Sequence, residues 1–183
     1  MRTATIRLVF TAFFVALGCI LPPLFHMIGA GTVFLPMHIP VLLCGFVCGA
    51  PYGAACGVIV PLLSSLFTGM PPVFPTALAM ALELCCYGAI TGLMFIKFNW
   101  NLYASLIAAM LCGRIISGLA NMALLGLAGQ EYSLKMFLTA SFITSMPGII
   151  IQIIVVPAII AILVKTQVIT RTKDPKSPVV SGG

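Results

Sequence analysis

The chain has 183 residues, of which 61% are hydrophobic and only 7% charged, and its mean hydropathy is +1.21. A soluble domain carries about 25% charged residues, so the composition excludes a soluble globular protein and indicates an integral membrane protein. The net charge of +6 does not indicate nucleic-acid binding, because the basic residues stand at the ends of apolar segments rather than on a polar face.

Six apolar segments follow one another along the chain. A helix of about 20 apolar residues spans a bilayer. The first span is predicted over residues 5–21, ended by Pro22-Pro23, and the others over 38–49, 52–67, 74–96, 102–127 and within 136–164. The predicted fold class is therefore all-α, an integral membrane bundle of six transmembrane helices in residues 1–165. The polar tail, 166–183, is predicted to be disordered.

The second and third predicted helices form a hairpin with a turn at Ala50-Pro51. The second is short, which indicates a tilted helix or one whose outer part is irregular and lines a cavity. Glycines stand at every fourth residue, at positions 45, 49, 53 and 57. Small residues at this spacing let helix backbones approach closely in lipid. We therefore expect this hairpin to pack tightly.

Lysine and arginine gather on one side of the predicted bundle. Six spans place both termini on the same side, and seven basic residues fall there against Lys135 on the other side. The excess of positive charge predicts that both termini are cytoplasmic and that loops 22–37, 69–73 and 128–135 are external. The seven are Arg2, Arg7, Lys97, Lys165, Arg171, Lys173 and Lys176.

Two ionisable residues, Glu83 and Arg114, lie inside predicted spans. Charged groups in the bilayer are costly and are functional candidates by default. At 1.5 Å per residue, Glu83 lies about 13 Å and Arg114 about 18 Å below the outer ends of their helices. The difference is one helical turn, which the two side chains can bridge. The pair is either a structural ion pair or part of a ligand site, and one pair can serve as both.

Other polar residues share faces with this pair. Ser117 and Asn121 follow Arg114 on one face, and Tyr87 and Thr91 follow Glu83. We predict that they converge on an outward-opening cavity, with Asn121 in contact with a ligand. For Thr91 and Gln152 an interhelical hydrogen bond is the favoured interpretation. His38, at a proline-rich mouth, has either a capping role or a ligand role.

The seven cysteines all stand in apolar runs. They have no histidine or second cysteine pair at zinc-ligand spacing, so packing is predicted rather than a metal site or a disulfide framework. The chain also has no G-x-x-x-x-G-K-[ST] motif and cannot bind ATP by a P-loop of its own. No cofactor is expected on this chain.

Ala12 and Ala16 form a small-residue pair on the first predicted helix. Together with the six short spans and the hairpin sequence FLPMHIPVLLCGFVCGAPYG…PLLSSLFTGMPP, this motif resembles the substrate-binding S components of energy-coupling factor (ECF) transporters. The resemblance covers about residues 4–165. It implies that Ala12 and Ala16 dock on a transmembrane coupling subunit carried by two ATPases, which would bind the ATP.

The resemblance also implies a prokaryotic, multi-pass cell-membrane protein that takes up a vitamin. Its pocket would lie near the outer face, built from the last three helices and capped by the first and third external loops. Pantothenate is the favoured substrate, because no tryptophan is near that pocket to stack on a flat ring. Arg114 would meet its carboxylate. The other candidate substrate residues are Phe34, which could stack on a ring, His38, Glu83, Tyr87, Ser117 and Asn121.

Two other functions compete with this interpretation. A stand-alone secondary carrier would use Glu83 as its proton site and would need no partner. A membrane enzyme would use His38, Glu83 or a cysteine, but no nucleophile and base stand at a recognisable spacing. The sequence therefore favours a binding subunit that is not an enzyme.

Overall fold

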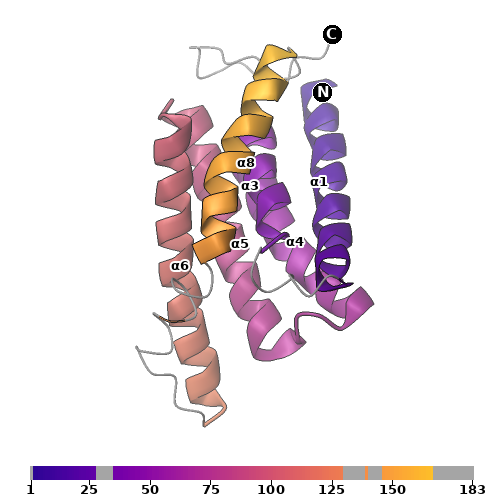
Figure 1. Ribbon diagram of the computed structural model, residues 1–183, viewed down its shortest axis with the longest axis vertical. Coiled ribbons are helices and arrows are strands. Elements are labelled where there is room, and N and C mark those ends of the chain that lie inside the picture. Colours follow the sequence, from indigo (N-terminus) through magenta and orange to yellow (C-terminus); the bar gives the residue numbers. More distant parts are fainter. Residues whose placement is uncertain (1, 28–34, 130–138, 140–145, 167–183) are drawn as a thin grey trace.

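The computed structural model describes residues 2–27, 35–129, 139 and 146–166, and its regular elements in these ranges are helices (Figure 1). The predicted all-α fold is confirmed. Five of the described helical stretches are long and apolar enough to cross a membrane, and the short second span is present as well. The helices are α1 (Arg2–Met27), α3 (His38–Cys48), α4 (Ala50–Thr68), α5 (Leu78–Gly92), α6 (Leu102–Leu127) and α8 (Met146–Lys165).

Two short π-helical segments extend α5 at its two ends. They are η1 (Val73–Ala77) and η2 (Leu93–Lys97), and with α5 they form one apolar stretch of 25 residues. The sequence predicted this span over 74–96. The sixth helix begins at Met146, inside the predicted segment 136–164.

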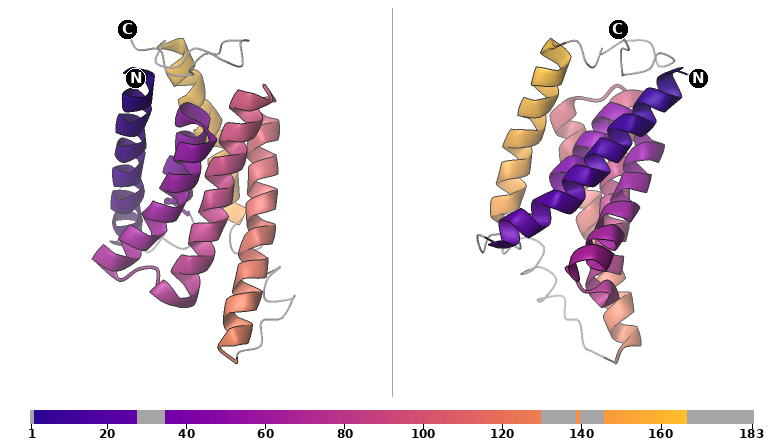
Figure 2. Two further views of the ribbon diagram at one scale, coloured as in Figure 1. Left: turned by 180° about the vertical axis from the view of Figure 1, so that it is seen from behind. Right: turned by 90° about the vertical axis from the view of Figure 1, so that its right-hand side faces the viewer.

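The helices run alternately up and down the bundle (Figures 1 and 2). The first residue of α1 and the last residues of η2 and α8 lie at one end of the bundle, which we call the terminal end (Figure 1). The segment 69–72 lies toward the opposite end, which we call the loop end. Lys97 and Lys165 are the last residues of their elements and therefore mark the terminal end. That the terminal end is cytoplasmic stays a prediction.

The first helix is longer than predicted. It was expected to end at Pro22-Pro23, because proline lacks an N–H group and crowds the preceding turn, yet α1 continues through both prolines to Met27. In membrane helices, neighbouring groups and local adjustments of the backbone tolerate proline. The extension carries His26 to the loop end of the bundle.

α3 and α4 are joined by the single residue Gly49. Its φ of 101° lies in the region that glycine adopts without strain. The turn therefore falls one residue before the predicted Ala50-Pro51. Pro51 instead stands in the first turn of α4, where a missing N–H costs nothing.

Glycines bring the backbones of α3, α4 and α5 together. A Cβ atom on Gly88 would meet the backbone of Gly53, and one on Gly57 would meet the backbone of Leu84. The close approach predicted for the hairpin glycines is confirmed at three of the four positions, and Gly49 makes the turn instead. We call the close-packed set the glycine seam: Gly45, Gly53, Gly57, Gly88 and Gly92.

α3 is the centre of the bundle. It packs against α1, α4, α5 and α8, and all its residues except Ile39 are buried. α1 packs on α3 and α4 and crosses them in the side view of Figure 2. With 11 residues, α3 is about 16 Å long, about half the thickness of the hydrocarbon core. Its first residue, His38, therefore lies deep inside the bundle.

Candidate functional site

The buried carboxylate of Glu83 is the centre of a polar cluster. The Arg114 Nη1 atom lies 3.1 Å from Glu83 Oε1, and the Tyr87 hydroxyl donates a hydrogen bond of 3.1 Å to the same oxygen. His38 Nε2 lies 3.6 Å from it. The ion pair predicted between neighbouring helices is confirmed. We call His38, Glu83, Tyr87 and Arg114 the Glu83 cluster; its members come from α3, α5 and α6.

Packing between α5 and α6 fixes the position of Tyr87. Tyr87 follows Glu83 by one helical turn, and its ring lies where a side chain at Gly113 of α6 would have to be. The ring also meets His38 edge to face, with the centroids 5.4 Å apart. Because Gly113 has no side chain, the tyrosine can fill this space and bring its hydroxyl to the carboxylate.

The Glu83 cluster is only partly satisfied. Arg114 Nε and Nη2 and both ring nitrogens of His38 are buried without a hydrogen-bond partner among the described residues. A buried donor without a partner costs about 1–3 kcal/mol, and more when it is charged. These atoms are available to hydrogen-bond to a polar ligand or to water.

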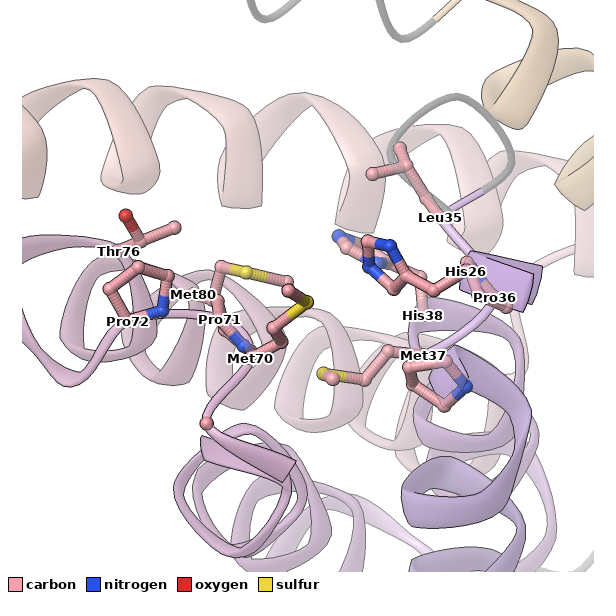
Figure 3. A pocket seen from close by; sticks show the side chains of 12 residues that line it. His26, Leu35, Pro36, Met37, His38, Met70, Pro71, Pro72, Thr76 and Met80 are labelled. Carbon is pink, nitrogen blue, oxygen red and sulfur yellow. The ribbon is translucent and has the colours of Figure 1, made fainter. Parts of the chain in front are cut away.

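A cavity of about 420 Å³ lies next to His38 of the cluster. Figure 3 shows the side chains that line this cavity. His38 belongs to both the cavity wall and the cluster, and Met80 of the cavity wall precedes Glu83 by one turn of α5. The sequence led us to expect walls from the last three helices, yet the described lining comes from α1, residues 35–37 with the first residue of α3, the segment 69–72, η1 and α5. The lining residues are Pro22, His26, Leu35, Pro36, Met37, His38, Gly69, Met70, Pro71, Pro72, Thr76 and Met80.

The remaining polar candidates differ in their surroundings. Ser117 is buried and lies one helical turn after Arg114 on α6. Asn121 is half-buried and donates a hydrogen bond of 2.9 Å to the Ser117 carbonyl, one turn back in its own helix. Thr91 is likewise bonded to the Tyr87 carbonyl, within its own helix rather than between helices. Phe34 lies outside the described residues.

Gln152 is a polar residue whose surroundings the sequence did not indicate. An interhelical hydrogen bond was expected, but both side-chain amide atoms are buried without a partner among the described residues. Gln152 lies on the buried face of α8, which packs against α3 and α6, the helices of His38 and Arg114. A lone amide in an otherwise apolar run was the only sequence signal.

Ala12 and Ala16 are both exposed on α1. Phe13 and Ile20 flank them, each 56% exposed. The pair is part of an apolar outer face that no other described helix covers. This arrangement leaves the face available to lipid or to another subunit.

The helices and the Glu83 cluster define a multi-pass α-helical membrane protein with a polar site inside its bundle. The sequence model of the family described as "ECF transporter, substrate-specific component" matches residues 6–160. The chain therefore belongs to this family. It is a family of transporter components and not a family of enzymes. Searches of curated proteins and of solved structures found no match.

Proposed function

We propose that this chain is the substrate-binding subunit of an ECF-type importer and that it takes up a water-soluble vitamin or vitamin precursor, with pantothenate as the favoured substrate. The observation that carries this proposal is the buried, unpartnered edge of Arg114. In this reading the ligand enters through the cavity at the loop end and reaches the Glu83 cluster.

Arg114 has one occupied and one unoccupied edge. Nη1 pairs with Glu83, while Nε and Nη2, which together form the adjacent edge of the guanidinium, have no partner among the described residues. Two parallel N–H groups on one edge match the two oxygens of a carboxylate. A ligand carboxylate therefore fits Arg114 without displacing Glu83.

The cavity walls favour a ligand with an aliphatic body. Prolines and methionines form most of the described lining, and its aromatic members are the imidazoles of His26 and His38. The single tryptophan, Trp100, follows η2 at the terminal end, away from the cavity. A flat vitamin would lack its best stacking partner, whereas pantothenate combines a carboxylate with hydroxyl, amide and methyl groups.

The partners are proposed from the family and from α1. The exposed pair Ala12 and Ala16 would dock on the transmembrane coupling subunit, because small residues allow close helix approach. Two separate ATPase subunits would supply the energy, since this chain has no P-loop motif. With cytoplasmic termini in a prokaryotic cell membrane, the loop end would open outward.

Calorimetric titration of the purified chain with pantothenate tests the site. Arg114→Lys keeps the charge but loses the planar edge. Because a hydrogen bond to a charged group contributes about 1.5–3 kcal/mol, affinity should fall about 10- to 100-fold. The matched control is Arg7→Lys on α1, which should bind like wild type. Equal affinity in a folded Arg114→Lys protein would contradict the assignment, and mass spectrometry of co-purified small molecules checks the ligand independently.

A proton-coupled carrier is the second candidate function. It is favoured by the 3.6 Å approach of His38 to the buried carboxylate of Glu83, a pair that could relay a proton. Proteoliposomes containing only this chain separate the two functions. The binding subunit should bind pantothenate without accumulating it, whereas a carrier should accumulate it until an uncoupler is added.

A further inference from the structure

The Glu83 cluster has no spare positive charge for an anionic ligand. Arg114 is permanently charged and is already paired with the Glu83 carboxylate at 3.1 Å. A ligand carboxylate on the free edge of Arg114 would leave two carboxylates sharing one guanidinium. A net charge in a buried site is strongly unfavourable, so binding requires one more positive charge nearby.

His38 is the side chain placed to supply this charge. It is 1% exposed, it lines the cavity, and its Nε2 atom lies 3.6 Å from Glu83 Oε1. Neither ring nitrogen has a hydrogen-bond partner among the described residues. Histidine is the side chain whose charge ordinarily changes between pH 5 and 8, and both nitrogens become donors when it is protonated.

We propose that His38 takes up one proton when a carboxylate ligand binds, and that this uptake makes the site selective for anions; the inference rests on the proposed function. Before binding, the charges of Glu83 and Arg114 cancel. After binding, two carboxylates face the guanidinium and an imidazolium, so the cluster is again neutral. The proton comes from the solution that delivers the ligand, and no covalent bond of the ligand changes.

The second N–H of His38 explains why the proton arrives together with the ligand. In the ligand-free cluster, Nε2 faces Glu83 while Nδ1 has no acceptor among the described residues. A second N–H formed there would be a buried donor without an acceptor among the described residues. The ligand brings both the acceptor and the negative charge, and a neutral analogue brings no charge.

Among the described residues, few other titratable groups lie near His38. Glu83 and Tyr87 face it from α5, and Arg114 reaches the same carboxylate from α6. On α1, His26 lines the cavity but is exposed. The described parts of α4 and α8 contain one charged residue, Lys165. Lys165 lies at the terminal end of α8, so neither helix contributes a charged side chain near the cavity.

Calorimetry in two buffers measures the proton directly. The wild-type chain is titrated with pantothenate at pH 7 in phosphate and in Tris, whose ionisation enthalpies differ, and the difference in heat gives the protons taken up. We expect an uptake of about one proton per ligand. Because binding takes up a proton, the affinity should weaken as the pH rises from 6 to 8, by up to about tenfold per pH unit. In His38→Gln the uptake should fall to near zero, and affinity should no longer depend on pH.

The other histidine of the chain, His26, also lines the cavity and is tested in the same way. His26→Gln should keep the proton uptake, and loss of the uptake in this variant would overturn the assignment to His38. The alcohol that carries CH2OH in place of the pantothenate carboxylate should bind with no uptake. Wild-type binding without proton uptake would overturn the inference and leave the proposed function standing, as would uptake retained in His38→Gln. Absence of any pantothenate binding would overturn the substrate assignment and this inference together. If His38→Gln fails to fold, the same measurement is made on His38→Asn, whose side chain cannot be protonated either, and uptake retained in that variant would overturn the inference.

Discussion

Replacing Gly88 by alanine tests the glycine seam. The new Cβ atom would lie 2.8 Å from the Gly53 Cα atom and closer still to the Gly53 carbonyl group. Carbon atoms pack best at about 3.5–4.0 Å, and backbone atoms cannot rotate away, so α4 and α5 must move apart by about 0.7 Å or more. Overpacking costs about 1–3 kcal/mol, and the better helix propensity of alanine returns about 1 kcal/mol. The expected net loss of stability is therefore up to about 2 kcal/mol.

The free energy of unfolding in bicelles, measured by steric trapping, checks this magnitude. Gly126→Ala is the matched control, because Gly126 is also helical but has nothing within 4 Å of an added Cβ. It should gain up to about 1 kcal/mol from propensity alone, so the two variants should change stability in opposite directions. If Gly88→Ala were as stable as Gly126→Ala, the close approach of α4 and α5 would be refuted.

Ala16→Arg should abolish uptake by the whole transporter and keep pantothenate affinity within about twofold, because Ala16 is exposed on α1 away from the cluster; a matching loss of affinity in calorimetry would contradict the docking role. Gln152→Leu should weaken binding about tenfold and preserve or raise the melting temperature, because it removes an unsatisfied buried amide; unchanged affinity would show that Gln152 does not meet the ligand. Arg114→Met should cost about 3–5 kcal/mol of stability by leaving Glu83 unpaired, and adding Glu83→Gln should restore most of it without restoring binding. A double-mutant cycle of thermal melts measures this recovery. If the stability losses of Arg114→Met and Glu83→Gln simply added in the double variant, the energetic coupling between Arg114 and Glu83 would be refuted.

The sequence predicted a membrane span well where polar residues mark the boundary of an apolar run. α6 has the predicted bounds because Asn99-Trp100-Asn101 precedes a long uninterrupted run, and its length alone is sufficient. α1 was predicted too short, because the rule that proline ends a helix is strongest in water. The sequence around Pro22 and Pro23 does not show which other helices will pack nearby, and in a membrane it is this packing that lets a helix continue through proline.

The candidate site was predictable only in part. Glu83 and Arg114 could be paired from depth alone, because each is charged and lies one helical turn from the level of the other. The approach of His38 could not be predicted, since α3 is buried on nearly all sides and its sequence carries no periodicity that marks one face. Its contact with Glu83 depends on where α3 lies between α1, α4, α5 and α8.

The one-residue connection at Gly49 also bears on how the chain enters the membrane. α3, with 11 residues, is too short to span the bilayer as an independent insertion unit, whereas α4, with 19, is long enough. A single residue between them leaves no loop that could stay at the surface while one helix inserts first. We therefore expect the translocation machinery to receive α3 and α4 as one helical pair, with the shorter helix carried in by the longer one.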